Sequence, residues 1–443
     1  MNTKRLKVLL VIEQCNPEWN SVPLEGYHLY NGISRFVDTT LVTHMRNKEA
    51  LEKIHADRSI VYIDNSDFIK ATENIGERLS TFKGQIIWPL MNTLTYPAYW
   101  EFNRLVYSQF QEAINRGDYD IVHAITPMMP RYPVKTVNAC RQTPFILGPV
   151  NGGVPFPKGF KAVANREFAY LNFLRSVGRS LIPGYRKTYK NANYILAGST
   201  YTLGLIRELF PTILDDQIEL FYENGITSSF IRSDKDVVQT KILDKVSVER
   251  KVKLLYVGRL VPYKGADMLL EAIGRLNTSV KEKIHLTIVG RGPEQTNLEH
   301  QVKRLELDGY IHFTGHIKQY QTLEYYQNSD IFCFPSVREF GGAVVLEAMA
   351  NALPCIVVDN GGIGEYVTEK TGFKISPVSR EFVIEKLAIY IAQLVEDHIM
   401  RHDMSCEAIQ RAKEFTWDVK TQKIVDIYSH ILEKKSMAVS TAE

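Results

Sequence analysis

Short apolar runs alternate with segments of helical periodicity along most of the chain, and this pattern constrains the fold more than any other feature. In the first half, the strand candidates lie at residues 7–12, 40–42, 121–124, 145–147 and 194–197. Runs of strand length that alternate with amphipathic helices are typical of βαβ units, in which the strands form a parallel sheet. The sequence therefore predicts an α/β fold.

The alternation restarts after a polar segment, which divides the chain in two. Residues 233–250 carry mixed charges without a strong apolar face, and further strand candidates follow at 253–260, 284–289, 311–313, 331–334 and 355–358. We expect one Rossmann-like domain in 1–232, a linker at 233–250 and a second Rossmann-like domain in 251–414. Because open α/β sheets bind ligands beyond the carboxyl ends of their strands, a cleft between the two domains is the expected site.

Two segments stand apart from this repeat. Residues 81–110 are rich in Trp, Tyr and Phe and do not fit a strand-helix unit, so we interpret them as an insertion. Residues 415–434 form one amphipathic pattern of helical period, and we expect this helix to pack back on the first domain.

Composition excludes several classes of protein. Apolar residues make up 45% and charged residues 23% of the 443, as in soluble globular proteins. No apolar run approaches the roughly 20 residues that a membrane-spanning helix needs. Glu13 ends the first apolar run early, which favours a buried strand over a secretory signal. The net charge of +3 gives no indication of nucleic acid.

Five scattered cysteines, without a C-x-x-C pair, argue against a disulfide framework or a zinc site. They are typical of the reducing cytoplasm. Asp118 and Asp120 flank Tyr119 ahead of a strand, where we expect them to cap its approach rather than to bind a metal. The sequence therefore predicts no metal and no bound cofactor.

Positive charge is concentrated in one stretch. From Phe156 to Lys190 there are eight Lys or Arg residues and a single acid, Glu167, interleaved with Phe, Tyr and Leu. One interpretation is a solvated helical face. The other is a patch that contacts anionic lipid or a phosphorylated acceptor, because clustered cations beside aromatic side chains suit both.

The segment SVREFGGAVVLEAMANALPCIVVDN, residues 336–360, predicts an anion site. A strand ends before it, and Gly341 and Gly342 precede a helix whose N-terminal N–H groups and partial positive charge suit an anion. Glu339 and Glu347 would repel a phosphate, so we expect them to bind hydroxyl groups. The alternative is a glycine turn with two surface glutamates.

A second group of cations lies in LLYVGRLVPYKGAD. Arg259 follows a strand and Lys264 lies five residues later at the start of a helix, so both can hold one diphosphate. A lone basic pair of this kind is more often solvated. The segment 336–360 downstream makes the phosphate interpretation stronger.

These motifs resemble a known family. In order they are Gly-Arg-x4-Lys-Gly, IVGRGPE, FTGHI, Glu-Phe-Gly-Gly-x4-Glu and NGGIGE, and together they resemble the retaining glycosyltransferases of family 4, which have the GT-B fold. The first half matches more thinly, in DIVHAITP, in the ENGI turn and in the terminal FTW helix. The resemblance implies two doubly wound domains facing across a cleft, with the acceptor side in 1–232 and the nucleotide-sugar side in 251–414.

The resemblance also implies an activity. It indicates a metal-independent hexosyltransferase that moves a hexose from a UDP- or GDP-sugar to a glycan, lipid-linked or polysaccharide-precursor acceptor. Retention would follow from front-face substitution, in which the leaving phosphate helps to deprotonate the acceptor hydroxyl. Alternatives are a GT-B phosphorylase or nucleotide-sugar epimerase, and a catalytically silent nucleotide-sugar-binding protein. An NAD-dependent enzyme is disfavoured because no G-x-G-x-x-G follows either opening strand.

Residue roles follow from the resemblance position by position. Arg259 and Lys264 would hold the donor phosphates, Glu347 the ribose and Glu339 the sugar. The implied donor-binding residues are Arg259, Lys264, Gly290, His316, Ile317, Glu339, Phe340, Gly341, Gly342, Ala343, Val344 and Glu347, with Gly26 in the first-strand loop. That loop departs from the family pattern, since it has single glycines where relatives have adjacent ones.

On the acceptor side, His123 would lie near the transferring sugar and complete a catalytic set with Glu339, Arg259 and Lys264. A histidine after a strand is otherwise most often structural. Asn151, in GPVNGG, is a candidate acceptor contact. We expect a cytoplasmic protein that binds a nucleotide sugar and a glycan or lipid-linked acceptor but no nucleic acid. The stretch from Phe156 to Lys190 would allow peripheral association with the inner membrane face.

Overall fold

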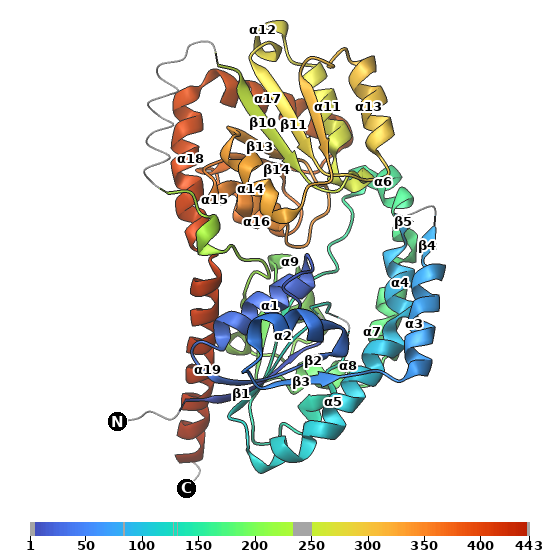
Figure 1. Cartoon of the computed structure of the whole chain (residues 1–443), viewed down its shortest axis with the longest axis vertical. Helices are drawn as coiled ribbons and strands as arrows, with labels where there is room; N and C mark the ends of the chain where they lie inside the picture. Colours follow the sequence, from blue (N-terminus) through green and yellow to red (C-terminus); the bar gives the residue numbers. More distant parts are fainter. Residues whose placement is uncertain (1–4, 83–84, 127, 131, 234–249, 441–443) are drawn as a thin grey trace. The chain divides into compact units, whose positions relative to one another are not determined.

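The computed structural model describes residues 5–82, 85–126, 128–130, 132–233 and 250–440 (Figure 1). The chain forms two compact units. The first unit comprises Met1–Gly153, Tyr170–Glu223 and Trp417–Glu443, and the second comprises Val154–Ala169 and Asn224–Thr416. The units differ from the predicted ranges, because the first gives way to the second at residue 224 and residues 154–169 belong to the second. Of the predicted linker 233–250, residues 234–249 lie outside the described part.

A parallel sheet of seven strands forms the centre of the first unit, in the order β3-β2-β1-β6-β7-β8-β9. Its strands are β1 (Lys7–Ile12), β2 (Asp38–His44), β3 (Ile60–Ile63), β6 (Ile121–Thr126), β7 (Phe145–Val150), β8 (Tyr194–Ala197) and β9 (Ile218–Leu220). The strand order reverses direction between β1 and β6, which is the arrangement of a doubly wound fold.

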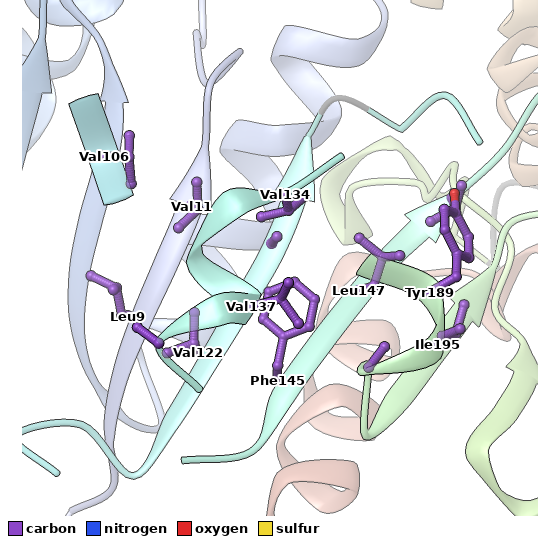
Figure 2. Packing of buried hydrophobic residues seen from close by; sticks show 14 of the residues in the cluster. Leu9, Val11, Val106, Val122, Val134, Val137, Phe145, Leu147, Tyr189 and Ile195 are labelled. Carbon is purple, nitrogen blue, oxygen red and sulfur yellow. The ribbon is translucent and has the colours of Figure 1, made fainter. Parts of the chain in front are cut away.

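Alternate residues of β1 enter two different cores, because successive side chains of a strand point to opposite faces. Leu9 and Val11 belong to one cluster, with Phe102 and Val106 of α5 (Tyr96–Arg116). Figure 2 shows residues of this cluster on β1, β6 and β7. Val8, Leu10 and Ile12 belong to the other cluster, which includes residues of α1 (Val22–Ile33) and α19 (Trp417–Ser440). Burial on both faces explains the uninterrupted apolar run of β1.

The remaining helices of the first unit are α2 (Lys48–His55), α3 (Asp67–Leu79), α4 (Trp88–Leu94), α7 (Phe173–Leu181), α8 (Tyr185–Lys190) and α9 (Thr200–Leu209). The aromatic segment 81–110 forms the short pair β4 (Thr81–Phe82) and β5 (Gln85–Ile86), then α4 and the start of α5. The C-terminal α19 packs beside α1. Within the described residues, no helix combines the length and the hydropathy that a bilayer crossing requires.

The second unit contains a parallel sheet of six strands in the order β12-β11-β10-β13-β14-β15. Its strands are β10 (Val252–Val257), β11 (Ile284–Val289), β12 (Ile311–Gly315), β13 (Ile331–Phe334), β14 (Cys355–Val358) and β15 (Gly372–Ile375). Its helices are α6 (Lys161–Arg166), α11 (Ala266–Gly274), α12 (Thr278–Lys281), α13 (Gln295–Arg304), α14 (Gln319–Gln327), α15 (Ala343–Ala350), α16 (Gly362–Tyr366), α17 (Arg380–Glu396) and α18 (His398–Lys413). The order reverses between the adjacent strands β10 and β13.

Candidate functional site

The two predicted motifs of the second half meet at the point where the strand order reverses. β10 and β13 are neighbours, and Arg259 and Lys264 follow the carboxyl end of β10. Glu339 follows the carboxyl end of β13. In open α/β sheets this edge is the usual place for a ligand, since the loops after the two strands diverge there.

An ion pair joins the two motifs. The Lys264 ammonium donates to Oε2 of Glu339, and the side chains keep 12% and 15% of their surface exposed. Ser336 Oγ donates to the same carboxylate oxygen over 3.1 Å. The Lys264 Nζ also lies 4.9 Å from the ring centroid of Phe334. Lysine and glutamate are thus held on opposite loops by charge, a hydroxyl and an aromatic face, and both remain open to a ligand.

Arg259 occupies the exposed side of this cluster. Its Nη2 donates to the hydroxyl of Tyr263 over 3.1 Å. Below it, the Tyr256 hydroxyl lies 3.5 Å from the carbonyl oxygens of both Arg259 and Lys264. Burial, with the nearby charge of Glu339, raises the pKa of Tyr256 well above its ordinary value, so the phenol stays neutral. The guanidinium is therefore placed at the site while its fork keeps donors for a ligand.

The loop after β13 reaches α15 through Gly342. This glycine has φ +75° and closely approaches Ile363, since a Cβ here would lie 2.3 Å from the Ile363 side chain. The N–H groups of Ala343 and Val344 then begin α15, where the first N–H groups of a helix have no partner inside it. The predicted stretch Gly341 to Val344 therefore forms a helix N-terminus close to Glu339, as an anion site requires.

Glu347 lies inside α15 and is 7% exposed. Its Oε2 accepts a hydrogen bond from the hydroxyl of Tyr326, on α14, over 2.8 Å. Burial and the charge of Glu347 raise the pKa of Tyr326 well above its ordinary value, which keeps this phenol a donor. The carboxylate of Glu347 is thus oriented by a neighbouring helix.

The other predicted residues of the second unit lie at the ends of β11 and β12. The N–H of Gly290 donates to the carbonyl of Gly315, so the two strand ends are joined. His316 is exposed and Ile317 is half-buried. A cavity of about 520 Å³ opens beside them, lined by Arg291, Gly292, Pro293, Gln295, Thr296, Glu299, Gly315 and His316.

His123 lies in the core of the first unit and is fully buried. Its Nε2 is 2.7 Å from the carbonyl oxygen of Gly148, and its Nδ1 is 2.6 Å from the hydroxyl of Tyr428 on α19. Because the carbonyl only accepts, Nε2 carries the proton and Nδ1 accepts from the phenol. Burial lowers the pKa of His123 to about 4, so the ring is neutral at pH 7. These contacts favour the structural interpretation of this histidine, and its predicted role at the sugar stays a prediction.

Asn151 and Gly26 also lie in the first unit. Asn151 Oδ1 accepts from Ser199 Oγ over 2.9 Å and from Thr202 Oγ1 over 3.0 Å, which ties the loop after β7 to the start of α9. Gly26 lies within α1, where a Cβ would be 2.3 Å from the carbonyl oxygen of Gln14. Both residues have a structural reason for their identity, and their ligand roles stay predictions.

Sequence reasoning missed three residues of the site: Ser336, Tyr263 and Tyr326. Ser336 precedes Glu339 by three residues at a strand end, which is a usable signal because one loop holds both. Tyr263 is adjacent to Lys264 and has a weaker signal. Tyr326 gave no signal, because its hydrogen bond to Glu347 exists only where the fold brings α14 close to α15. Within the described residues, no group of three His, Cys, Asp or Glu side chains is arranged to hold a metal ion.

Residues 238–411 match the protein family described as glycosyl transferases group 1. The chain is 25% identical over 189 residues to a D-inositol 3-phosphate glycosyltransferase of Kribbella flavida. The matched part is 41% of this chain and 44% of that protein, so the chain matches less than half of its relative's length.

Two solved structures resemble the chain over nearly its full length. HepE of Anabaena, in complex with UDP, is 17% identical with a TM-score of 0.59, covering 96% of this chain and 100% of that one. WaaG, a glycosyltransferase involved in lipopolysaccharide biosynthesis, is 14% identical with a TM-score of 0.58, covering 95% and 99%. Together with the two doubly wound sheets, this likeness confirms the predicted α/β fold class, GT-B.

Proposed function

We propose that the protein is a nucleotide-sugar-dependent glycosyltransferase. It moves a hexose from a UDP- or GDP-sugar to a glycan, lipid-linked or polysaccharide-precursor acceptor, with retention at the anomeric carbon. The observation that carries the proposal is the Lys264–Glu339 pair at the point where the strand order reverses, beside the N-terminus of α15. Cations and a helix terminus suit a diphosphate, and a carboxylate suits sugar hydroxyls.

The Lys264–Glu339 pair explains how one site can hold both parts of the donor. Lys264 has three N–H donors, so it can donate to a phosphate oxygen while it keeps its bond to Glu339. The second oxygen of the Glu339 carboxylate then accepts from a sugar hydroxyl. Arg259 and the N-terminus of α15 add positive charge where the diphosphate departs, and stabilisation of developing charge by prepositioned groups usually contributes most to catalysis. In our proposal these groups replace a metal ion.

Glu347 receives the ribose in this arrangement. A ribose offers adjacent hydroxyl groups, and a carboxylate accepts from both. The hydrogen bond from the Tyr326 hydroxyl orients the Glu347 carboxylate. Gly290, His316 and Ile317 would lie along the diphosphate and the base, and the cavity beside His316 offers space for part of the nucleotide.

Two similar proteins support the proposal, one through the nucleotide in its structure and the other through the transfer for which it is named. HepE was solved with UDP, and the relative from Kribbella flavida is named for transfer to inositol 3-phosphate. UDP is therefore the first nucleotide to test.

The basic stretch is our candidate for contact with an anionic membrane. Tyr170, Phe173 and Leu181 are exposed in the first unit, and Arg186 and Lys187 are exposed in α8. Residues 156–169, the first part of the stretch, belong to the second unit. The membrane proposal therefore concerns residues 170–190, on the first unit. Flotation with anionic vesicles tests it: reversing the charges of Arg186 and Lys187 should reduce binding, and unchanged binding would refute it.

A thermal-shift panel of UDP, GDP, ADP and their sugars tests the donor proposal. A ligand at 100 times its dissociation constant stabilises the protein by about 2.7 kcal/mol, which shifts the melting temperature by several degrees. No shift with any nucleotide would refute the proposal. A product assay separates the alternatives, because a phosphorylase releases a sugar phosphate, an epimerase releases no nucleotide diphosphate, and a silent binding protein gives a shift but no product.

A further inference from the structure

The second unit contains one segment from the first half of the chain. Val154–Ala169, here the 154–169 segment, lies between residues 153 and 170, which both belong to the first unit. Its helix α6 packs against the 3-10 turn η7 (Pro262–Lys264), the turn that carries Lys264. Figure 1 draws α6 in the second unit near α13. The segment is therefore a structural part of the unit that holds the candidate donor site.

Arg338 connects this segment to the loop that carries Glu339. Its Nε donates to the carbonyl oxygen of Val154 over 2.7 Å. Its guanidinium carbon lies 4.8 Å from the ring centroid of Phe156 and 5.0 Å from that of Phe340. A planar cation between two aromatic rings is held by the negative faces of both. Phe340 is the residue directly after Glu339, so this contact reaches the site itself.

Asn360 makes a second connection at the same place. Its Nδ2 is 3.2 Å from the carbonyl oxygen of Pro155 and 2.7 Å from that of Val337. The next residue, Gly361, forms an isolated parallel bridge with Glu339. Three backbone segments are thus joined around Glu339, and one of them is the start of the 154–169 segment.

The far end of the segment reaches the other side of the site. Arg166, the last residue of α6, forms a 2.5 Å ion pair with Glu294. Glu294 lies between Pro293 and Gln295, which line the cavity beside His316. The 154–169 segment therefore extends from the Glu339 loop to the border of this cavity.

We propose that the 154–169 segment helps to form the donor site, and that Arg338 is a positioning residue for Glu339. This inference rests on the proposed transfer from a nucleotide sugar. Two adjacent glycines follow Phe340, and such a backbone has much conformational freedom to lose. The arginine, held between Phe156 and Phe340, restricts the loop so that the Glu339 carboxylate meets the sugar hydroxyls. The cations that bind the diphosphate, Arg259 and Lys264, lie on another loop, the one that follows β10.

The variants Phe156→Ala and Arg338→Lys test this inference. Lysine keeps the charge but lacks the planar fork that lies between two rings. The matched control is Phe68→Ala, which removes an exposed phenylalanine of α3 in the first unit. For each protein we would measure the Kd of UDP and of UDP-glucose, or of GDP and GDP-mannose if those stabilise the wild type.

A small misplacement of a positioned group can lower a reaction rate up to about 100-fold. We expect the smaller disturbance here to weaken the binding of the nucleotide sugar about tenfold in both variants. Binding of the nucleoside diphosphate should change less than about twofold, since Arg259 and Lys264 are untouched. The double variant should be no worse than Arg338→Lys alone, because both changes break the same contact. A merely structural role would weaken both ligands alike.

A second measurement needs no ligand. Hydrogen exchange of residues 336–342 should speed up in Phe156→Ala and stay at the wild-type rate in Phe68→Ala. Unchanged exchange, or equal losses of affinity for both ligands, would overturn the role of Arg338. A wild type that binds neither ligand would instead contradict the proposed function, so the two failures can be told apart.

Discussion

The candidate residues of the two units differ in how far their polar groups are satisfied by the protein. In the second unit, Lys264 and Glu339 pair with each other at a strand edge and keep part of their surface exposed. In the first unit, His123 is fully buried and both ring nitrogens have protein partners. A mostly buried ion pair need not add to stability, because the cost of desolvating its charges offsets their attraction, whereas a buried, fully bonded neutral side chain contributes to folding. In our proposal the binding chemistry is therefore concentrated in the second unit.

The largest expected effect on the rate of sugar transfer follows from removing the ammonium group of Lys264. Lys264→Ala should lower the rate of sugar transfer about 1000-fold, since loss of one group that stabilises a developing charge costs 100- to 1000-fold and here Glu339 is also left without its partner. The measurement is kcat for transfer from the nucleotide sugar that stabilises the wild type. Lys303→Ala, an exposed lysine of α13, is the control and should leave kcat unchanged. A loss of less than tenfold would remove Lys264 from the phosphate site.

Neutralising the Glu339 carboxylate separates sugar binding by Glu339 from phosphate binding by Lys264. Glu339→Gln should lower transfer about 100-fold, because the amide accepts more weakly from sugar hydroxyls. It should bind the nucleoside diphosphate at least as tightly as the wild type, since Lys264 no longer shares its charge with a carboxylate. Kinetics and calorimetry with UDP measure the two effects, with Glu324→Gln on α14 as control. Weaker diphosphate binding would show that Glu339 does not act on the sugar alone.

The contrast also explains what could be read from the sequence. The strands β1, β8, β11, β13 and β14, none of which lies at a sheet edge, have the predicted bounds, because most of their side chains are apolar and buried. The edge strands β3, β9 and β15 were missed, since they are short and partly exposed. Lys264 and Glu339 could be proposed from the sequence, because their charges and their positions after predicted strands can both be read from it.

The 154–169 segment could not be predicted for a different reason. Arg338 and Asn360 bond to the backbone carbonyls of Val154 and Pro155, and every residue offers such a carbonyl. The identity of those residues therefore carries no signal. The same holds for His123, whose partner Gly148 accepts through its backbone and whose partner Tyr428 lies 305 residues away.

The structural role of His123 can be tested by measuring the stability of a variant. His123→Gln should lower the free energy of unfolding by about 2 kcal/mol, because it disturbs two buried hydrogen bonds. The folded-state pKa of about 4 lies below the ordinary value of 6.5, so between these pH values only the unfolded chain takes up the proton. The advantage of the wild type over the variant should therefore shrink as the pH falls from 6.5 towards 4.

Urea unfolding at several pH values measures this, with His312→Gln, an exposed histidine of β12, as control. A variant as stable as the wild type but deficient in transfer would reverse the contrast between the units, because it would place His123 at the sugar.

The smallest effect concerns the orientation of Glu347. Tyr326→Phe removes one hydroxyl that donates to this carboxylate over 2.8 Å and leaves the packing of α14 unchanged. A hydrogen bond to a charged group contributes about 1.5 to 3 kcal/mol, but the Tyr326 hydroxyl only orients Glu347 and does not bind the nucleotide itself, so we expect nucleotide affinity to fall only about fivefold. Tyr325→Phe on the same helix is the control. If Tyr326→Phe weakened binding of the nucleoside as much as binding of the nucleoside diphosphate, Glu347 would act on the ribose. A loss confined to the diphosphate would contradict that role, because a carboxylate that accepts from ribose hydroxyls does not bind phosphate.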